Sequence, residues 1–383
     1  MKIIHIAVNY LDGLGYQENL LPLYQKNAGD DVIVVSSRQK VSKSFLEPAC
    51  RVGILNKGRE YYLDGIKIYR IDTYLNISST AFICFGLGDI LEKESPDVIF
   101  HHNVGLATLS VASNYKKRHP NVKLYVDNHA DWINESKNRI WHLFYYDFLM
   151  PLHVKYHGDN VDYFIGVSPL RCQYLNQVYR VPQNRIRFLP IGCDTEKVKQ
   201  VNESKAELRV KHTIPQESFV VVSGGKIDRT KGTLTLIEAC KELQKENPNL
   251  FLVLFGKIDE EISTEAMKHK WIKMFGWCDR IKTISLLKMA DVACWPWLHT
   301  TLIEDSVAAG TPLVVKMSDN VSHFAREEAG VFMKNGNKDE LMAAMMEVKE
   351  NKDIYQSNVS KARQRYSYAN LVRLLESEDF CEI

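Results

Sequence analysis

The sequence has no hydrophobic run long enough to cross a bilayer, no close cysteine pair and no strong excess of either charge. A membrane-spanning helix needs about 20 consecutive apolar residues, and no stretch of this chain approaches that length. None of the eight cysteines forms a Cys-x-x-Cys pair, so zinc-ribbon and thiol-redox motifs are not expected. The formal net charge of +2 gives no domain-wide basic surface, which argues against nucleic acid as the main partner.

Length and composition indicate an ordinary globular protein with more than one domain. A chain of 383 residues exceeds what one simple hydrophobic core usually organises, so two domains are expected. The residues are 45% hydrophobic and 25% charged, which is typical of a water-soluble fold. The apolar segment Met1–Val8 is too short for a secretory signal. We expect it to be the first strand of a cytoplasmic protein.

Short β-branched segments alternate with helical patterns in both halves of the chain. This alternation predicts an α/β fold of two Rossmann-like, doubly wound domains. Asp64-Gly65 is typical of a hairpin turn between Arg59–Leu63 and Ile66–Ile71. The predicted parallel strands are Ile3–Val8, Asp31–Ser36, Val98–His101, Lys123–Asp127, Tyr163–Val167, Ser218–Val222, Phe251–Phe255, Lys273–Phe275, Val292–Cys294 and Pro312–Lys316. The predicted helices are Gln17–Asn27, Ala81–Glu94, Leu106–Arg118, Arg139–His157, Thr233–Lys245, Ile281–Ala290, Glu304–Ala309 and Lys338–Lys349.

The segment Tyr179–Lys197 is rich in proline and glycine and is predicted to carry the crossing between the domains. We therefore expect an N-terminal domain over 1–188 and a second domain over 189–354. The remaining residues, 355–383, are expected to form one or two amphipathic helices that pack back on the first domain.

The segment Gly225–Gly232 places glycines and two lysines, Lys226 and Lys231, between an apolar strand and a helix. Free backbone amides, the helix dipole and two ammonium groups then converge on one point. Such a point suits a diphosphate. The alternative is an ordinary strand-to-helix loop with solvated lysines.

A second polar loop follows the predicted strand that ends near Pro296. Thr300 and Thr301 are typical N-cap residues, and their amides are predicted to face a phosphate. Glu304 or Asp305 is predicted to accept hydrogen bonds from sugar or ribose hydroxyls. Alternatively, both acids only complement the dipole of the next helix.

The order of these motifs along the chain resembles the retaining glycosyltransferases of family 4. The family's Gly-Arg-Leu-x-x-x-Lys-Gly loop is matched by Gly225-Lys226-Ile227 and Lys231-Gly232. Its Glu-Ala-Met-Ala-x-Gly-x-Pro segment is matched loosely by Asp305–Pro312. Further similar segments, in collinear order, are Gly13–Glu18, Asp127–Asp131, Leu189–Lys197 and Phe275-Gly276-Trp277.

The resemblance implies a GT-B fold, with two domains facing across a cleft, and transfer of a sugar from a nucleoside-diphosphate sugar to a hydroxyl. A UDP-sugar is the expected donor, and a glycan or lipid-linked glycan in polysaccharide assembly is the expected acceptor. The implied catalytic residues are His129, Lys226, Lys231 and Glu304. The implied donor-binding residues are Gly15, Gly225, Gly276, Trp277, His299, Thr300, Thr301, Leu302 and Asp305. The implied acceptor-side residues are Gly13, Tyr16, Asn103 and Asp131.

Two departures from the family pattern concern the donor side. Lys226 stands where the family has arginine, which keeps the charge but loses the bidentate fork. Counting back from Asp305 puts Trp297 where the family has the first of two glutamates, with His299 nearby. Either Glu304 or Asp305 then supplies the second acid.

The residues of the first domain also have plainer interpretations. Gly13 and Gly15 form half of a dinucleotide fingerprint, but the third position is Glu18, so a nicotinamide site is not expected. His129 is either a buried core histidine or a functional group at a strand's carboxyl end. His101 and His102 also end a strand and are a second histidine candidate.

Two further expectations concern membranes and metals. The aromatic run Arg139–Met150 either lies on an anionic membrane at the inner face of the cell or packs into the core. The chain has no Asp-x-Asp triad, so no metal or other cofactor is expected and lysines would stabilise the leaving diphosphate. A nucleotide-sugar epimerase and a non-catalytic partner subunit remain alternatives.

Overall fold

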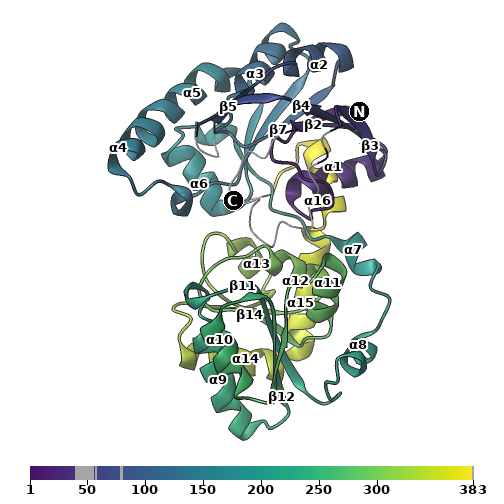
Figure 1. Ribbon diagram of the computed structural model, residues 1–383, viewed down its shortest axis with the longest axis vertical. Coiled ribbons are helices and arrows are strands. Elements are labelled where there is room, and N and C mark those ends of the chain that lie inside the picture. The colour runs from purple at the N-terminus through teal and green to yellow at the C-terminus, as the bar shows by residue number, and fades with distance from the viewer. Residues whose placement is uncertain (39–55, 57, 78–80, 382–383) are drawn as a thin grey trace. The chain divides into compact units, whose positions relative to one another are not determined.

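The computed structural model describes residues 1–38, 56, 58–77 and 81–381 and divides the chain into two compact units (Figure 1). Unit 1 comprises Met1–Pro190 and Leu371–Ile383, and unit 2 comprises Ile191–Asn370. Each unit is built on a parallel sheet flanked by helices, which confirms the predicted α/β class. Cys50 and the side chain of Cys84 lie outside the described part of the chain.

The division differs from the predicted boundaries at 188/189 and 354/355. The chain enters unit 2 after Pro190 and returns to unit 1 at Leu371. Helix α15 (Lys352–Arg365) stays in unit 2 because it packs on α12 (Leu302–Ala309). The end of α16 (Tyr368–Ser377) is tied to unit 1 because the carboxylate of Glu378 accepts from Tyr125 Oη at 2.8 Å.

Unit 1 contains a sheet of eight strands in the order β10-β9-β8-β7-β1-β2-β4-β3. Only β3 pairs antiparallel, through the predicted Asp64-Gly65 hairpin. The central register sets Ile4 beside Ile33 on one side and Ile99 on the other. The strands are β1 (Lys2–Ile6), β2 (Asp31–Ser37), β3 (Glu60–Leu63), β4 (Ile66–Ile71), β7 (Val98–His102), β8 (Lys123–Asn128), β9 (Tyr163–Gly166) and β10 (Ile186–Phe188).

The predicted helices of unit 1 are found except at two places, and α6 (Pro169–Gln177) was not predicted. Within the predicted helix Ala81–Glu94, Ala81–Cys84 is a strand, β6, that pairs with β5 (Thr73–Ile77). The helix begins only at Leu87, because Gly86 has a φ of +84° and interrupts the chain there. The helices of unit 1 are α1 (Gln17–Ala28), α2 (Leu87–Glu94), α3 (Thr108–Arg118), α4 (Arg139–His142), α5 (Met150–His157) and α6 (Pro169–Gln177).

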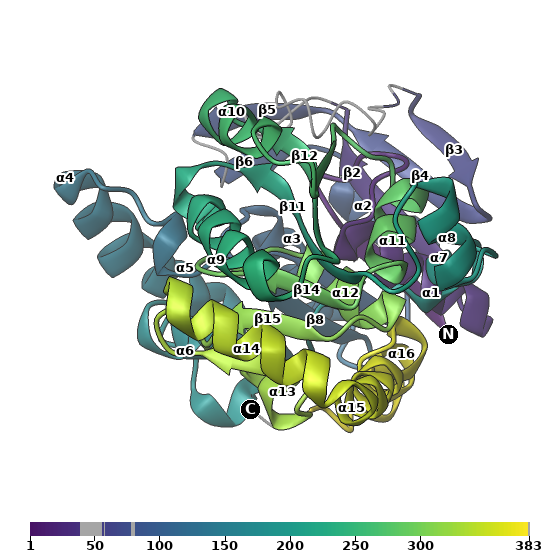
Figure 2. The same ribbon diagram turned by 90° about the horizontal axis from the view of Figure 1, so that it is seen from below.

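The second place is the predicted helix Arg139–His157, whose middle is a π-helical segment, η4 (Leu143–Leu149), between α4 and α5. It keeps the chain helical but changes the spacing at which side chains share a face. Figures 1 and 2 show α4 at the edge of its unit.

Unit 2 contains an all-parallel sheet in the order β13-β12-β11-β14-β15-β16. Helices α9 and α14 pack on the face that includes Val221, Cys294 and Val314. Alternate residues such as Val222 and Ala293 are also fully buried, so both faces of the sheet are covered. The strands are β11 (Phe219–Ile227), β12 (Leu250–Ile258), β13 (Ile272–Phe275), β14 (Val292–Trp295), β15 (Leu313–Lys316) and β16 (Gly330–Met333). The helices are α7 (Thr195–Lys199), α8 (Lys205–Lys211), α9 (Thr233–Glu246), α10 (Glu260–Met267), α11 (Arg280–Lys288), α12, α13 (Ser322–Arg326), α14 (Lys338–Glu350) and α15.

Candidate active site

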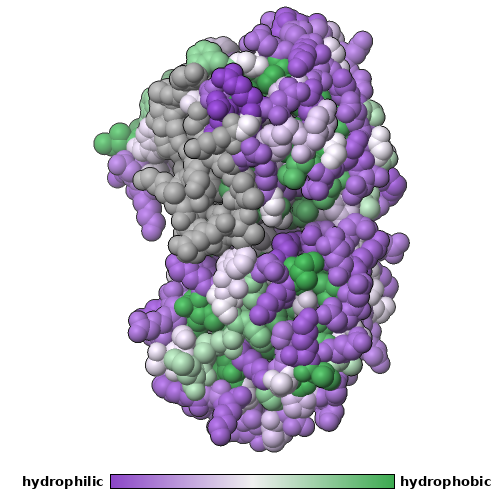
Figure 3. Space-filling model, turned by 45° about the vertical axis from the view of Figure 1, so that its right-hand side comes forward, coloured by the Kyte–Doolittle hydropathy of each residue, from purple (hydrophilic) through white to green (hydrophobic). Residues whose placement is uncertain are grey.

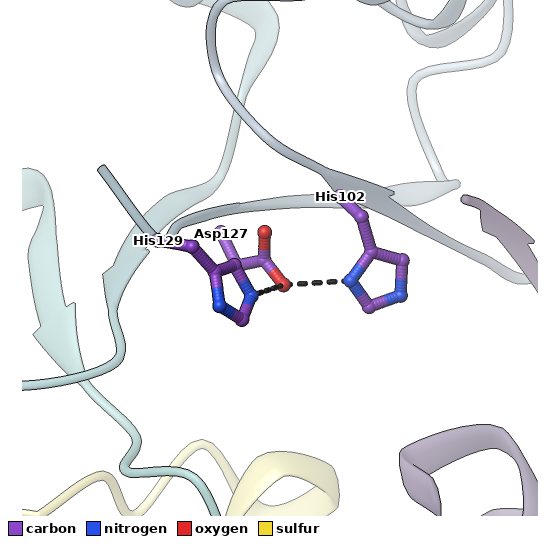
Figure 4. Close-up of side chains that lie close together, drawn as sticks. All are labelled: His102, Asp127 and His129. Atoms are coloured by element: carbon purple, nitrogen blue, oxygen red, sulfur yellow. Dashed lines mark hydrogen bonds and ion pairs between the residues drawn. The ribbon is translucent and has the colours of Figure 1, made fainter. Parts of the chain in front are cut away.

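Three side chains meet at the carboxyl ends of neighbouring strands in unit 1 (Figure 4). His102 ends β7, Asp127 lies near the end of β8, and His129 follows β8 by one residue. Asp127 Oδ2 accepts from His102 Nδ1 at 2.7 Å and from His129 Nε2 at 3.2 Å. Burial acts to raise the pKa of Asp127, but the two imidazoles outweigh it and hold this pKa well below its usual range. Asp127 is therefore an ionised carboxylate shared by two histidines.

His129 is the member of this trio that reaches the surface, with 29% of its side chain exposed, whereas Asp127 is fully buried. Burial acts to lower the pKa of His129, and the bond to Asp127 outweighs burial and raises this pKa above its ordinary value. The backbone oxygen of His129 accepts from Arg171 Nε at 2.8 Å, which fixes the turn after β8. The structure thus puts His129 in an environment that favours its protonated form.

His101, the neighbour of His102, is not part of the trio. Successive side chains in a strand point to opposite faces, and His101 Nε2 instead bonds Thr108 Oγ1 at 2.8 Å. Burial lowers the pKa of His101 to about 3. We therefore assign His101 to the packing between β7 and α3.

The same trio is the group of described residues whose ligand atoms lie close enough together, within 4.8 Å, to hold a metal ion. The hydrogen bonds that His102 and His129 give to one oxygen of Asp127 account for this closeness. The trio therefore forms a hydrogen-bonded cluster without requiring an ion.

The predicted acceptor-side residues lie around this cluster in different roles. The backbone amide of Asn103 donates to Asp127 Oδ1 at 2.8 Å, and Asn103 has a φ of +81° that turns it there. Asp131 is buried and accepts from the amide of Ile133 at 3.0 Å. Asn103 and Asp131 thus support the local backbone.

The glycine-rich loop between β1 and α1 presents Gly13 and Tyr16 to solvent. Gly13 has a φ of +80°, the left-handed conformation that favours glycine. Tyr16 is 44% exposed and precedes α1 without capping it through its side chain. Gly15 lies between them and is partly buried. This loop contributes exposed backbone rather than charged groups.

In unit 2, the first glycine of the predicted diphosphate loop, Gly225, belongs to the strand and not to a turn. Strand β11 continues through Gly225 to Ile227 and pairs there with β12. A Cβ on Gly256 would lie 2.1 Å from the backbone oxygen of Gly225, so the two strands approach too closely for any side chain. The turn itself is the 3₁₀ segment Arg229–Lys231, which ends at Gly232 with a φ of +74°. The sequence predicted a glycine turn at Gly225, but close backbone contact between β11 and β12 continues the strand through this residue instead.

The turn brings Lys231 to the loop that precedes α12. Lys231 Nζ lies 3.4 Å from the backbone oxygen of His299, and His299 Nε2 bonds Glu304 Oε1 at 3.1 Å. Burial lowers the pKa of Lys231. The second oxygen of Glu304, Oε2, is buried and has no hydrogen-bond partner. A buried carboxylate oxygen with an open acceptor position is suited to a ligand hydroxyl.

Lys226 lies on the same segment but in a different environment. Its side chain is 55% exposed, and Nζ is 3.8 Å from Asp228 Oδ2. The structure therefore separates the two predicted lysines into a half-buried one and an exposed one.

The carboxylate of Asp305 is bound by an arginine of the same unit. Its carboxylate receives both hydrogen bonds of Arg280 Nη1, at 2.9 and 2.7 Å, and Arg280 Nη2 bonds Asp194 at 3.1 Å. Burial acts to lower the pKa of Arg280, but the two carboxylates outweigh it and raise this pKa. Of the two acids that the sequence leaves open, Glu304 is the one with an oxygen available to a ligand.

The remaining donor-side residues lie at or after the carboxyl ends of β11, β13 and β14. An atom at the Cβ position of Gly225 would lie 3.3 Å from Leu302 Cδ1 and 3.8 Å from Thr300 Oγ1, so the glycine gives these residues room. Thr301 occupies the N-cap position of α12 without a side-chain capping bond. Gly276 and Trp277, exposed after β13, lie near the end of β12, because Gly276 accepts from the Gly256 amide at 3.0 Å.

Trp297, at the position of the family's first glutamate, has a packing role. Its indole would lie 2.9 Å from a Cβ on Gly232, and Nε1 donates to Gly336 at 3.1 Å. The site therefore has no carboxylate at this position, and His299 with Glu304 is the acid–imidazole pair present.

Sequence reasoning missed four residues that hold the two sites. His5 and Gln25 extend the histidine cluster, and Arg280 and Asp194 hold Asp305. A histidine inside the otherwise apolar strand β1 was the available signal for His5. No local pattern connects Arg280 to Asp194, which are 86 residues apart.

Two family models match the chain, one in each half. Residues 204–368 match the model described as "Glycosyl transferases group 1", and residues 22–197 match "Glycosyltransferase Family 4". Together with the two parallel α/β units, these matches define the class: the chain carries a glycosyltransferase domain in each half, and its fold is GT-B.

Among particular proteins, the chain is similar to the "Putative glycosyltransferase EpsD" of Bacillus subtilis (strain 168), with 23% identity over 247 residues. This match spans 62% of the chain and 62% of EpsD, less than two thirds of the length of that relative. The donor, acceptor and complete activity of this chain are therefore matters for proposal.

The chain is also similar to solved structures along nearly its whole length. Anabaena Alr3699/HepE in complex with UDP has a TM-score of 0.68 and 14% identity, with 99% of each chain covered. Trehalose-6-phosphate from E. coli bound with UDP-2-fluoro glucose has a TM-score of 0.68 and 12% identity, covering 99% of this chain and 98% of the other. WaaG, a glycosyltransferase involved in lipopolysaccharide biosynthesis, has a TM-score of 0.62 and 13% identity, with 98% of each covered. At these identities the similarity shows the fold.

Proposed function

We propose that this protein transfers a sugar, with retention of anomeric configuration and without a metal ion, from a UDP-sugar to a hydroxyl acceptor. One observation carries the proposal: half-buried Lys231 lies 3.4 Å from the backbone oxygen of His299, whose ring bonds the buried carboxylate of Glu304, in the glycosyl transferases group 1 domain. A cation for a diphosphate and an open carboxylate oxygen for a hydroxyl are thus connected through one residue, His299. UDP or a UDP-sugar in the structures of HepE and the E. coli protein supports this donor class.

On the donor side, the Lys231 ammonium would bind the diphosphate, and Glu304 Oε2 would accept a hydrogen bond from a sugar or ribose hydroxyl. The amides of Thr301 and Leu302 begin α12 and add the positive end of a helix dipole. Each donor aimed at the developing charge is worth about 2.7–4 kcal/mol in other enzymes. These groups would stabilise the leaving diphosphate without a divalent cation.

In the transfer step, the bond between the anomeric carbon and the diphosphate oxygen breaks, and the acceptor oxygen bonds the same carbon from the same face. The proton of the acceptor hydroxyl passes to the leaving diphosphate oxygen, so no separate base is needed. His129, held protonated by Asp127, would donate a hydrogen bond that orients the reacting sugar. Retention follows from attack on the face that the diphosphate leaves.

For the acceptor, we propose a glycan or lipid-linked glycan in polysaccharide assembly at the inner face of the cell membrane. The support is an exposed apolar stripe on α4 and η4, where Ile140 is 82%, Leu143 66% and Phe148 61% exposed. On the face drawn in Figure 3, by contrast, hydrophobic residues form scattered patches among hydrophilic ones. Within the described ranges, no helix is both long and apolar enough to cross a membrane, so contact through this stripe would be peripheral.

A binding and turnover assay tests the proposal. UDP and UDP-sugars should raise the melting temperature of the wild type, and the Lys231→Ala variant should lose most of that shift. With an acceptor present, UDP release should follow acceptor concentration, and the anomeric coupling of the product should match that of the donor. Conversion of the donor without acceptor would instead identify an epimerase. Binding without turnover across a donor and acceptor panel would identify a non-catalytic partner.

A further inference from the structure

A pocket of about 440 Å³ lies in unit 1 next to the exposed apolar stripe of α4 and η4. Its volume falls within the range of roughly 300–1,000 Å³ that is typical of small-molecule sites. Phe148, an exposed residue of the stripe, also lines the pocket, so the two features are contiguous there. The other apolar and aromatic lining residues include Leu152, Val154, Phe164, Tyr179 and Pro182.

Three cations line the pocket, and two of them are available to a ligand. The guanidinium of Arg185 donates to the backbone oxygens of Gly158, at 2.6 Å, and of Val161. Lys155 and Arg180 are exposed, and within the described part of the chain no hydrogen bond or ion pair engages either charged group. An anionic group of a ligand in this pocket would therefore pair with Lys155 and Arg180.

Two acids also line the pocket, which leaves one excess positive charge among its five charged residues. Asp147 Oδ2 lies 3.5 Å from His142 Nδ1. Asp159 lies in the 3₁₀ segment Gly158–Asn160 that precedes β9. Among the described residues, neither acid forms an ion pair with the two exposed cations, so these cations keep their charge for a ligand.

The backbone directs Arg180 toward solvent. Its φ of +57° is in the left-handed region, which residues other than glycine seldom adopt. Tyr179 and Val181, on either side, are 3% and 0% exposed, so this turn buries both neighbours and leaves Arg180 outside. Glycine is the common residue at such a turn after a helix. An arginine here carries backbone strain of the kind that is found at functional sites.

The pocket lies at the opposite end of the sheet from the cluster around His129. Gly158 and Asp159 precede β9, and Pro182 and Arg185 precede β10, so the pocket is at the amino ends of these parallel strands. The cluster lies at the carboxyl ends of β7 and β8, which run parallel to β9. The four residues of β9 span about 13 Å. A ligand of this pocket is therefore held apart from the reacting groups, which favours a lipid of the bilayer over the acceptor.

We propose that this pocket binds one hydrocarbon chain of an anionic phospholipid, with Lys155 and Arg180 paired to the phosphate of that lipid. The stripe would rest on the surface of the same bilayer, and the pocket would take up a single chain from it. The inference deepens the peripheral membrane contact that is part of the proposed function. Binding of the lipid itself requires no sugar transfer.

Dodecyl phosphate below its micelle concentration is the first probe, because it has one chain and one phosphate and offers no membrane surface. By titration calorimetry it should bind the wild type more tightly than dodecyl maltoside, whose head group is neutral, and inorganic phosphate should not bind measurably. Equal affinity for the two amphiphiles would overturn the role of the cations. Absence of dodecyl phosphate binding would overturn the whole proposal.

A variant that fills the pocket locates the binding. Leu152→Trp should lower the affinity for dodecyl phosphate at least about tenfold, since displacing two methylene groups from an apolar site suffices for that. Ile140→Ser is the matched control, because Ile140 is 82% exposed on the stripe and does not line the pocket. It should leave this affinity unchanged. Equal affinity in Leu152→Trp and the wild type, or an equal loss in Ile140→Ser, would contradict binding in the pocket.

Arg180→Gly tests the cation without a risk to the fold. It should lower the affinity for dodecyl phosphate about two- to fivefold, the range of an exposed ion pair. Its melting temperature should stay the same or rise, because glycine adopts the left-handed conformation without strain. Arg139→Gln removes an exposed cation of α4 that does not line the pocket and should leave the affinity unchanged. An equal loss in Arg139→Gln would show that general charge attraction drives the binding.

Sedimentation with vesicles separates the two sources of such a chain. Vesicles of phosphatidylcholine and phosphatidylglycerol contain no lipid-linked glycan, and they should retain the wild type more strongly than Leu152→Trp. If this variant instead lost only the binding of a polyprenyl phosphate in phosphatidylcholine vesicles, the pocket would belong to the acceptor and the assignment to a bilayer lipid would be wrong.

Transfer to a water-soluble acceptor provides a separate readout. Sugar transfer by a protein that does not bind dodecyl phosphate would reject only the lipid pocket. Dodecyl phosphate binding by a protein that neither binds UDP nor transfers a sugar would reject only the proposed function.

Discussion

The two units prepare their functional groups in opposite ways. In unit 1 the charges satisfy one another: Asp127 bonds both His102 and His129, and only His129 extends to the surface. In unit 2 a carboxylate is left incomplete, because Glu304 Oε2 is buried without a hydrogen-bond partner, and His299, which bonds the other oxygen of Glu304, is also contacted by Lys231. The first arrangement holds a proton in place, and the second leaves positions for a ligand.

The supports also differ between the units. Side chains hold the histidine cluster, whereas close backbone contact shapes the donor side. Gly225 lies against Gly256, and Gly232 lies under Trp297, with no room for a Cβ at Gly232 or Gly256. Pairing of opposite charges still stabilises unit 2, but Arg280 bonds Asp305 and Asp194 rather than the open carboxylate of Glu304.

The largest effect is expected on stability when Arg280 is replaced. Arg280→Ala would leave Asp305 and Asp194 buried without their cation, which typically costs about 3–5 kcal/mol. Urea unfolding measures the loss. Arg229→Ala removes an arginine from an exposed pair with Glu261 and serves as control, with an expected cost below about 1 kcal/mol. Equal losses of unfolding free energy in the two variants would show that burial does not make the ion pairs of Arg280 more important than the exposed pair of Arg229.

Acid should weaken unit 1 before unit 2. In unit 1, burial lowers the pKa of two histidines, His5 and His101, to about 3. In unit 2, burial lowers the pKa of His323 to about 3. Below pH 6.5 the unfolded chain protonates these rings while the folded protein does not, so each costs about 1.4 kcal/mol per pH unit down to about pH 3. Hydrogen exchange at pH 7 and pH 5 would measure each unit. Earlier opening of unit 2 would contradict this order.

Loss of Lys231 should reduce catalysis more than it reduces stability. In Lys231→Ala we expect kcat/KM to fall at least tenfold, about 1.4 kcal/mol or more, since the diphosphate loses its half-buried cation. Steady-state kinetics with a UDP-sugar measures this change, and the thermal midpoint reports whether the fold persists. Near-normal turnover in the folded variant would refute the diphosphate assignment.

Lys226→Ala tests the difference between the two lysines. Because Lys226 is 55% exposed and lies near Asp228, we expect kcat/KM to fall less than about threefold. The measurement is the same as for Lys231→Ala, at two salt concentrations. A decrease in kcat/KM as large as that of Lys231→Ala would show that side-chain exposure does not predict how much each lysine contributes to catalysis.

Removal of divalent cations should have no effect. Since Lys231 and helix amides would stabilise the leaving group, EDTA should leave the initial rate of transfer unchanged. Complete loss of activity, restored by Mn²⁺ or Mg²⁺, would overturn the metal-free mechanism and direct attention to His102, Asp127 and His129.

Much of the fold was predictable because it depends on local pattern. Alternating apolar strands and amphipathic helices predicted both parallel sheets, and the predicted hairpin at Asp64-Gly65 is confirmed. The prediction was wrong at Ala81–Cys84, where pairing with β5 overrides a helical pattern. It also missed β16, a short strand that begins at Gly330 with its backbone pressed against Leu313.

The sequence by itself determined which chemical groups are present: the lysines of Gly225–Gly232, the acids before Gly310 and the histidine after Asp127. Only the tertiary structure decided which of them remain open to a ligand. Arg280 forms an ion pair with Asp305 and not with Glu304, which bonds His299 through one oxygen. His5 lies within hydrogen-bond distance of His102, although the two are 97 residues apart in the sequence. Such choices depend on burial and on contacts between segments far apart in the chain, and no local pattern of residues encodes these contacts.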